Sequence, residues 1–145
     1  DLYVIVENYY DQHASENTPI THYSNSFFNF EDLQVVSNST FPSASVKISR
    51  GADVFNASAV GSGPIDALYS AIADITKIDI KLVEYNISSV SRGKEALGKV
   101  KITVEHEDEK YIAKAADTDI LRASALAYVN AINSIIAAKI SPVIV

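Results

Sequence analysis

The sequence has no cysteine, no methionine and no tryptophan, and it has few basic residues. Without cysteine the chain can form neither disulfides nor zinc–thiolate sites. Lysine and arginine number 12 against 18 aspartates and glutamates, so the net charge is −6. Nucleic acids and anionic membranes bind basic surfaces, and we therefore expect neither as a partner. Because even the first residue is not methionine, we expect the 145 residues to be a piece of a longer protein.

Long uninterrupted apolar segments are scarce as well. The apolar C-terminus, IIAAKISPVIV, is broken by Lys139 and Pro142, so it predicts no membrane span. Asp1 and Glu7 are acidic at positions where a signal peptide carries basic residues. We therefore expect a cytoplasmic protein.

The chain also has little that could carry out catalysis or hold a metal ion. His13, His22 and His106 are too widely spaced for an HxH or HExxH ligand pair. The acidic run EHEDEK, residues 105–110, stands between two strand-like segments and predicts a solvated hairpin turn. No serine lies in the strand–turn–helix context of a nucleophile elbow. The sequence predicts no catalytic residues and no metal site in this chain.

The N-terminal part is expected to be separate from the main domain. Asp1 is a good N-cap, and Leu2, Ile5, Val6 and Tyr9 have the spacing of a short amphipathic helix over residues 1–12. The polar, turn-rich stretch that follows predicts a flexible linker over 13–30. The remaining residues, 31–145, are expected to form the folded domain.

Within that domain the alternation and periodicity of apolar residues predict three strands and a helix, twice over. The first set consists of strands EDLQVVS, SASVKIS and DVFNASAV and a helix that starts at Pro64. The second set consists of strands IKLVEYNISSV, GKVKITVEHE and KYIAKAA and the helix DTDILRASALAYVNAINSIIAAK, which ends ahead of Pro142.

A shift of 56 positions superposes the two sets without a gap. Val46 then falls on Ile102 and Ile48 on Val104, and four alanines fall on alanines: 57, 59, 67 and 71 on 113, 115, 123 and 127. The shift keeps the phase of both strands and helices. We therefore predict an α+β fold of two pseudo-symmetric βββα modules, residues 31–77 and 78–138, with helices packed on antiparallel sheets. Two helices and six strands leave an apolar surface uncovered, which predicts a symmetric dimer.

The junction between the first three strands and their helix is unusually bare: Gly61, Ser62, Gly63, Pro64. Glycine permits positive φ and removes the Cβ atoms that keep a ligand from the backbone. Pro64 suits the first helical position, and the free N–H groups with the helix dipole suit an anion. The dinucleotide fingerprint fails, because Asp66 occupies the place of its third glycine, and no Walker motif is present. A single carboxylate, such as that of an amino acid, fits this acidic chain better than a phosphate does. The alternative is that the glycines only close a tight turn and Asp66 only caps the helix.

Three stretches together resemble a known family: GSGPIDALYSAI, LVEYNISSVSRGKEALGKVKITV and DTDILRASALAYVNAIN. They are similar to the C-terminal regulatory domain of 2-isopropylmalate synthase and citramalate synthase. The resemblance covers residues 31–136, and the expected first helix resembles the subdomain that links the catalytic barrel of that family to this domain.

The resemblance implies a function. In the family this domain dimerises and binds the end-product amino acid, leucine or isoleucine, at the dimer interface. Binding inhibits a separate TIM barrel, which uses a divalent metal and acetyl-CoA. It follows that this chain is expected to bind no cofactor of its own, to signal to its own catalytic barrel and to catalyse nothing itself.

The resemblance also implies a set of effector-binding residues. They come from the bare turn, the long strand and the segment after it, and the start of the second helix: Gly61, Ser62, Gly63, Pro64, Leu82, Tyr85, Ser89, Ala96, Thr118 and Ile120. Ser89 and Ala96 are small and leave room for the γ-branched end of leucine, which favours leucine and a 2-isopropylmalate synthase parent. The alternatives are an isoleucine-inhibited citramalate synthase and a dimerisation module without an effector. The second has one hint, since AKAAD stands where the family commonly has a glycine-rich strand.

Overall fold

The computed structural model describes residues 26–37, 40–92 and 95–140. The helix predicted over 1–12, most of the linker predicted over 13–30 and the last five residues lie outside this described part. Nothing in the structure bears on those predictions.

The described residues form three strands and a helix, followed by three more strands and a second helix, as predicted. The first module consists of β1 (Asn29–Val36), β2 (Ser43–Arg50), β3 (Asp53–Val60) and α3 (Pro64–Thr76). The second consists of β4 (Lys81–Arg92), β5 (Glu95–His106), β6 (Glu109–Asp117) and α4 (Ile120–Ile140). The order confirms the α+β class and the two βββα modules. Three strands start earlier than predicted, β1 at Asn29, β5 at Glu95 and β6 at Glu109.

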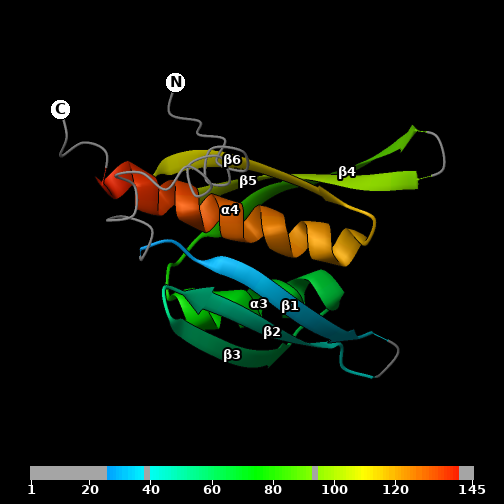
Figure 1. The fold of residues 1–145 in the computed structure, drawn as a ribbon, viewed down its shortest axis with the longest axis horizontal. Helices are drawn as coiled ribbons and strands as arrows, with labels where there is room; N and C mark the ends of the chain where they lie inside the picture. The colour runs from blue at the N-terminus through cyan, green and yellow to red at the C-terminus, as the bar shows by residue number, and fades with distance from the viewer. Residues whose placement is uncertain (1–25, 38–39, 93–94, 141–145) are drawn as a thin grey trace.

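The strands form two separate three-stranded antiparallel sheets, in the orders β1-β2-β3 and β4-β5-β6. In each module the helix packs on one face of its sheet: α3 on β2 and β3, and α4 on β5 and β6 (Figure 1). A single sheet face with alternating apolar residues requires such a cover.

The repeat read from the sequence is present in the structure. The two central strands bury matching residues under their helices, and the two helices begin at residues 56 apart, Pro64 and Ile120. The matching buried residues are Ala44, Val46 and Ile48 on β2 and Val100, Ile102 and Val104 on β5.

The two modules share one hydrophobic core. Helix α4 packs against α3 and also against β1 of the first module. Phe27 and Phe28, directly ahead of β1, are buried. The folded part therefore begins before the boundary at residue 31 that the sequence predicted.

Helix α4 is the centre of this core. By length and composition it is apolar enough to cross a membrane, with a mean hydropathy of 1.4, although no such segment was predicted from the sequence. The prediction rested on Lys139 and Pro142, which interrupt only the C-terminal end of the apolar stretch. The 18-residue window in question is 61% buried inside the fold. The helix is apolar because two sheets and a helix surround it.

The hairpin of β4 and β5 projects past the N-terminal end of α4 (Figure 1). We call the described residues 87–92 and 95–98 of this hairpin the arm. Several large apolar side chains along β4 and β5 are exposed: Leu82, Val83, Ile87 and Leu97. This strand pair therefore presents apolar surface that no other described element covers.

Candidate functional site

The bare turn ahead of α3 is closed by hydrogen bonds from its own residues. The Gly61 amide donates to the carbonyl of Pro42 (3.0 Å). The Asp66 Oδ2 atom accepts from the Ser62 amide (2.9 Å) and from the Ser62 hydroxyl (3.3 Å). Asp66 therefore closes the turn from the first turn of α3. This agrees with the alternative interpretation, in which Asp66 caps the helix.

Positive φ explains neither glycine of the turn, and packing requires glycine only at Gly61. Gly63 has a φ of −158°, which is extended backbone, and Gly51 is the only glycine in the described residues with positive φ. Neither Gly61 nor Gly63 adopts the positive φ that glycine permits. A Cβ atom on Gly61 would lie 2.5 Å from the Ala67 nitrogen, so the helix start approaches too closely for any side chain. A Cβ atom on Gly63 would meet nothing within 4 Å.

The start of α3 leaves several backbone donors available. Gly63 is the N-cap and makes no side-chain capping bond, and Pro64 has no N–H. In the part of the chain that the structure describes, the amides of Gly63, Ile65 and Asp66 have no hydrogen-bond partner. Free N–H groups at a helix start, with the positive end of the dipole, attract an anion.

The equivalent start of α4 is already filled by carboxylates of the chain itself. The Asp119 Oδ1 atom accepts from the Leu121 amide (2.9 Å), and the Asp117 Oδ1 atom accepts from the Asp119 amide (2.9 Å). Arg122 Nε lies 3.7 Å from the other oxygen of Asp117. Under the 56-residue repeat, Asp117 and Asp119 stand where the first module has Gly61 and Gly63. The predicted site residue Thr118 is exposed between them and donates only to Asp117 (3.4 Å).

A groove between the modules opens directly beside the bare turn. We call it the tyrosine groove, and its volume is about 510 Å³. It is bordered on one side by α3 and on the other by the second module, through the residues Ile65, Asp66, Tyr69, Ser70, Ala73, Ile80, Leu82, Tyr85 and Tyr128. Leu82 and Tyr85 were predicted as site residues. Asp66 is the only charged residue of this lining, and most of the rest is apolar.

The walls of the groove contain three tyrosines in contact. The Tyr69 ring lies 4.4 Å from the Tyr128 ring and 6.5 Å from the Tyr85 ring, between centroids. Burial raises the pKa of Tyr69, and it raises the pKa of Tyr128 to about 12, with the nearby Asp79 carboxylate adding to the shift. Both phenols are therefore neutral at physiological pH. Neither Tyr69 nor Tyr128 was predicted as a site residue from the sequence. Their meeting depends on how α3 packs against α4, which no local pattern shows.

The other predicted site residues lie around the arm rather than in the groove. Ser89 pairs with Gly98 across the hairpin and Ala96 pairs with Ser91, and both Ser89 and Ala96 are exposed. A Cβ atom on Gly98 would overlap the Cδ1 atom of Ile120, so Ile120 packs directly against the arm. Along a strand, Ser89 is about 13 Å from Tyr85. The predicted site residues of one chain therefore form two groups. Leu82 and Tyr85 line the groove, and the turn at residues 61–64 adjoins it through Ile65 and Asp66. Ser89, Ala96, Thr118 and Ile120 lie around the arm.

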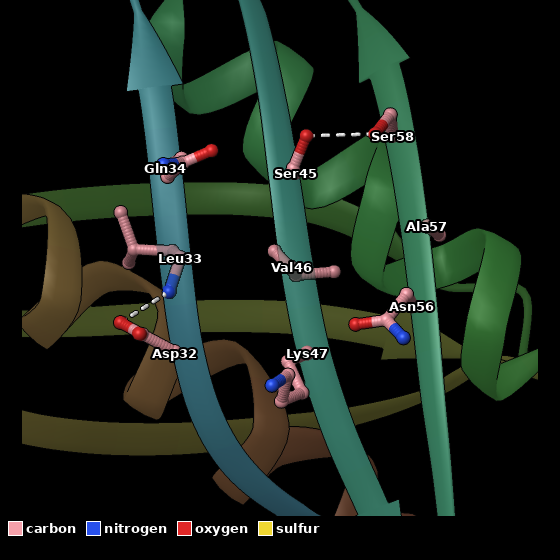
Figure 2. A pocket seen from close by; sticks show the side chains of 9 residues that line it. All are labelled: Asp32, Leu33, Gln34, Ser45, Val46, Lys47, Asn56, Ala57 and Ser58. Carbon is pink, nitrogen blue, oxygen red and sulfur yellow. Dashed lines mark hydrogen bonds between the residues drawn. The ribbon is translucent and has the colours of Figure 1, made fainter.

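A second hollow lies on the outer face of the first sheet, away from α3 (Figure 2). Its volume is about 210 Å³, and it crosses all three strands from Asp32 to Ser58. The Ser45 and Ser58 hydroxyls are 2.7 Å apart there. It contains none of the predicted site residues. Among the described residues no group of three histidine, aspartate or glutamate side chains could hold a metal ion.

Comparison with known proteins identifies the family. The profile of the family described as "LeuA allosteric (dimerisation) domain" matches residues 1–136. This chain belongs to that family. The match confirms the resemblance found in the sequence and extends it over the N-terminal residues.

Relatives of this LeuA allosteric domain are 2-isopropylmalate synthases. The chain is 47% identical to the enzyme of Geobacillus sp. (strain Y412MC10) over 113 residues, which is 78% of the chain and 22% of the relative. It is 47% identical to that of Sediminispirochaeta smaragdinae over 66% of the chain and 19% of the relative. It is 41% identical to that of Pyrococcus furiosus over 74% of the chain and 22% of the relative. The chain thus spans about a fifth of the length of the curated relatives it matches.

Proposed function

We propose that this chain is the regulatory domain of a 2-isopropylmalate synthase and that it binds leucine to bring about feedback inhibition. Isoleucine is the second candidate effector. The observation that carries the proposal is the tyrosine groove, which combines free backbone donors at one end, one carboxylate and an otherwise mostly apolar lining. A neutral amino acid with an aliphatic side chain has the matching chemistry.

The effector carboxylate belongs at the start of α3. The second module supports this assignment, because there Asp117 and Asp119 bring carboxylates to the equivalent amides. The first module has glycines at those two positions and leaves its amides free. An external carboxylate at α3 would accept hydrogen bonds from the free amides, as the side chains of Asp117 and Asp119 do at α4.

The effector ammonium group belongs near Asp66. Both hydrogen bonds that Asp66 accepts go to Oδ2, and in the described part of the chain Oδ1 has no partner. A charge-assisted bond from an ammonium group to Oδ1 would place the cation within reach of the turn that holds the carboxylate. Asp66 was not among the residues that the resemblance implied.

The aliphatic side chain belongs against Leu82, Ile65 and the tyrosine rings. Burying the side chain of leucine is worth about 2–3 kcal/mol. The lining supplies contact on the α3 side and on the β4 side. In the described part of the chain, the groove is open to solvent on its outer side.

A second copy of the chain would supply a wall on that side. The arm carries Ser89, Ala96 and exposed Ile87, and in the family the effector lies at the dimer interface. We propose that the arm of one copy closes the groove of the other, so that the two residue groups meet only in a homodimer. The small Ser89 and Ala96 then leave room for leucine.

The rest of the parent protein is expected to lie in the part of the relatives that this chain does not span. We propose that it is a cytoplasmic TIM-barrel acyltransferase, which uses a divalent metal and acetyl-CoA. The domain would act on that barrel when leucine binds and would hold no cofactor itself.

Calorimetric titration of the chain tests the proposal. Leucine should bind at micromolar concentrations with isoleucine weaker, whereas 4-methylpentanoate, which lacks the ammonium group, and isoamylamine, which lacks the carboxylate, should each bind at least about tenfold more weakly. Tighter binding of isoleucine would point to a citramalate synthase instead. A dimer that gives no heat with either amino acid would be a dimerisation module without an effector.

A further inference from the structure

Ser124 is a fully buried serine in the first turns of α4, and it contacts both walls of the tyrosine groove. Its hydroxyl donates to the carbonyl of Ile120 (2.8 Å) and lies 2.6 Å from the Tyr85 hydroxyl. Its backbone carbonyl accepts from the Tyr69 hydroxyl (3.0 Å). Tyr69 comes from α3 of the first module and Tyr85 from β4 of the second, so one residue holds a side chain from each module.

The protons of this cluster can be assigned one by one. A serine hydroxyl has a single proton, and a carbonyl oxygen only accepts, so the Ser124 proton points at Ile120. The short contact with Tyr85 must then use the proton of the Tyr85 hydroxyl. The Tyr69 proton points at the Ser124 carbonyl. Both tyrosine hydroxyls therefore use their only proton on Ser124, and their oxygens have only acceptor capacity left.

We propose that Ser124 is a positioning residue of the effector site, an inference that rests on the proposed function. It fixes the separation of the two groove walls, and it makes the Tyr85 and Tyr69 hydroxyls acceptors toward any other group. Together with the Asp66 carboxylate, this leaves the tyrosine side of the groove rich in acceptors, while the turn offers donors. A ligand that reaches Tyr85 must present a donor there, which is the polarity of an α-ammonium group beside a carboxylate.

A serine that only bonds the carbonyl four residues back is common in helices and would matter for stability alone. The two roles differ in what Tyr85 contributes. If Ser124 positions the groove, Tyr85 and Ser124 act as a unit, and removing one hydroxyl already removes the effect of the other. If Ser124 only satisfies its own helix, the two residues are independent.

The test is a double-mutant cycle in the whole chain, with Ser124→Ala, Tyr85→Phe and the double variant. Leucine affinity is measured by calorimetry and unfolding by urea. Each single variant should weaken leucine binding about tenfold, and the double variant should be no weaker than the worse single one. Ser134→Ala is the matched control: Ser134 is an equally buried serine on α4 but does not line the groove. It should lower the urea midpoint without changing leucine affinity.

Two results would overturn the inference: wild-type leucine affinity in Ser124→Ala, or effects of the two single variants that simply add. The proposed function fails in a different way, when the wild-type chain does not bind leucine at all. The cycle on urea unfolding still decides the inference in that case, since additive losses of stability would refute a coupled Tyr85–Ser124 unit without any ligand.

Discussion

Asn133 forms two hydrogen bonds with the backbone of Phe28, 105 residues earlier in the chain: its Oδ1 accepts from the Phe28 amide and its Nδ2 donates to the Phe28 carbonyl, both at 2.9 Å. Asn133 is 1% exposed and Phe28 3%. The side chain completes the hydrogen bonding of a buried backbone unit at the start of β1, and it does so from α4. The two modules are joined at this point by polar bonds as well as by the shared core.

Asn133→Leu should therefore destabilise the chain strongly. The substitution leaves a buried amide and a buried carbonyl without partners, which costs about 3 kcal/mol or more. Urea unfolding followed by circular dichroism measures the loss. Asn130→Ala is the control, since it removes one half-buried bond to the Lys114 carbonyl (3.0 Å) and should cost about 1 kcal/mol. Equal losses in the two variants would contradict the special role of Asn133.

The two glycines of the turn should respond differently to alanine. Gly61→Ala places a methyl group against the Ala67 nitrogen and should cost about 1–3 kcal/mol of stability. Gly63→Ala meets open space in extended backbone and should change stability by less than about 1 kcal/mol. Leucine binding should weaken in Gly63→Ala if the effector carboxylate occupies the open space beside Gly63, because the methyl group would then fill part of that space. Thermal unfolding and calorimetry separate the two effects, and unchanged affinity in Gly63→Ala would mean that the carboxylate lies elsewhere.

Asp119→Ala should cost about 1 kcal/mol, since it removes the carboxylate that caps α4, whereas Asp119→Gly should cost only a few tenths, about 0.3 kcal/mol. Asp119→Gly gives α4 an uncapped glycine N-cap like that of α3. Thr118→Ala serves as the control, because Thr118 is exposed and makes one long bond of 3.4 Å. Urea midpoints of the three variants measure these costs. A larger loss in Thr118→Ala than in Asp119→Ala would count against the capping role.

Ser89→Ile tests whether the arm reaches the groove of a second copy. Ser89 is exposed in one chain, so the substitution should leave the stability of the monomer unchanged within about 0.5 kcal/mol. If the arm closes the groove of the partner, leucine should bind more weakly, and isoleucine should lose less than leucine. Light scattering on the same samples reports whether the dimer persists. A persistent dimer with unchanged leucine affinity would place the arm outside the effector site.

Stability should fall steeply in alkali. Burial holds the pKa of Tyr128 at about 12 in the folded chain, whereas an unfolded tyrosine ionises near 10. The unfolded state therefore loses its proton first, and the stabilisation present below pH 10 is lost as the pH rises toward 12. Each such tyrosine contributes about 1.4 kcal/mol per pH unit in that window. Urea unfolding between pH 9 and 11.5 measures the slope. Tyr128→Phe should make it shallower, and an unchanged slope would contradict the assignment.

The order of strands and helices was predictable from the sequence because its signals are local. Alternation in SASVKIS and the 3.6-residue spacing after Pro64 each depend on neighbours within a few positions. The 56-residue repeat then predicted the two-module architecture, and this prediction needed no information on tertiary contacts. The start of α4 was also within reach, since Asp119 stands where a capping aspartate belongs.

The features that could not be predicted from the sequence depend on tertiary packing and on backbone conformations that the residue types allow but do not enforce. Glycine permits positive φ but does not enforce it, so the conformation of Gly63 could not be inferred. Tyr85 and Ser124 are 39 residues apart and meet only because α4 lies on its sheet. Ser89 and Ala96 came from the resemblance, and among the described residues they do not line the tyrosine groove. A single sequence describes one copy, whereas the proposed site needs two.

The unequal helix starts have a consequence for how a parent enzyme would respond to its end product. A duplicated module usually doubles its binding sites, but here Asp117 and Asp119 occupy the second position with the chain's own carboxylates. If the start of α3 binds the effector as proposed, each chain has a single effector site. Any cooperativity in inhibition would then arise between chains, and in a dimer its Hill coefficient would not exceed about 2.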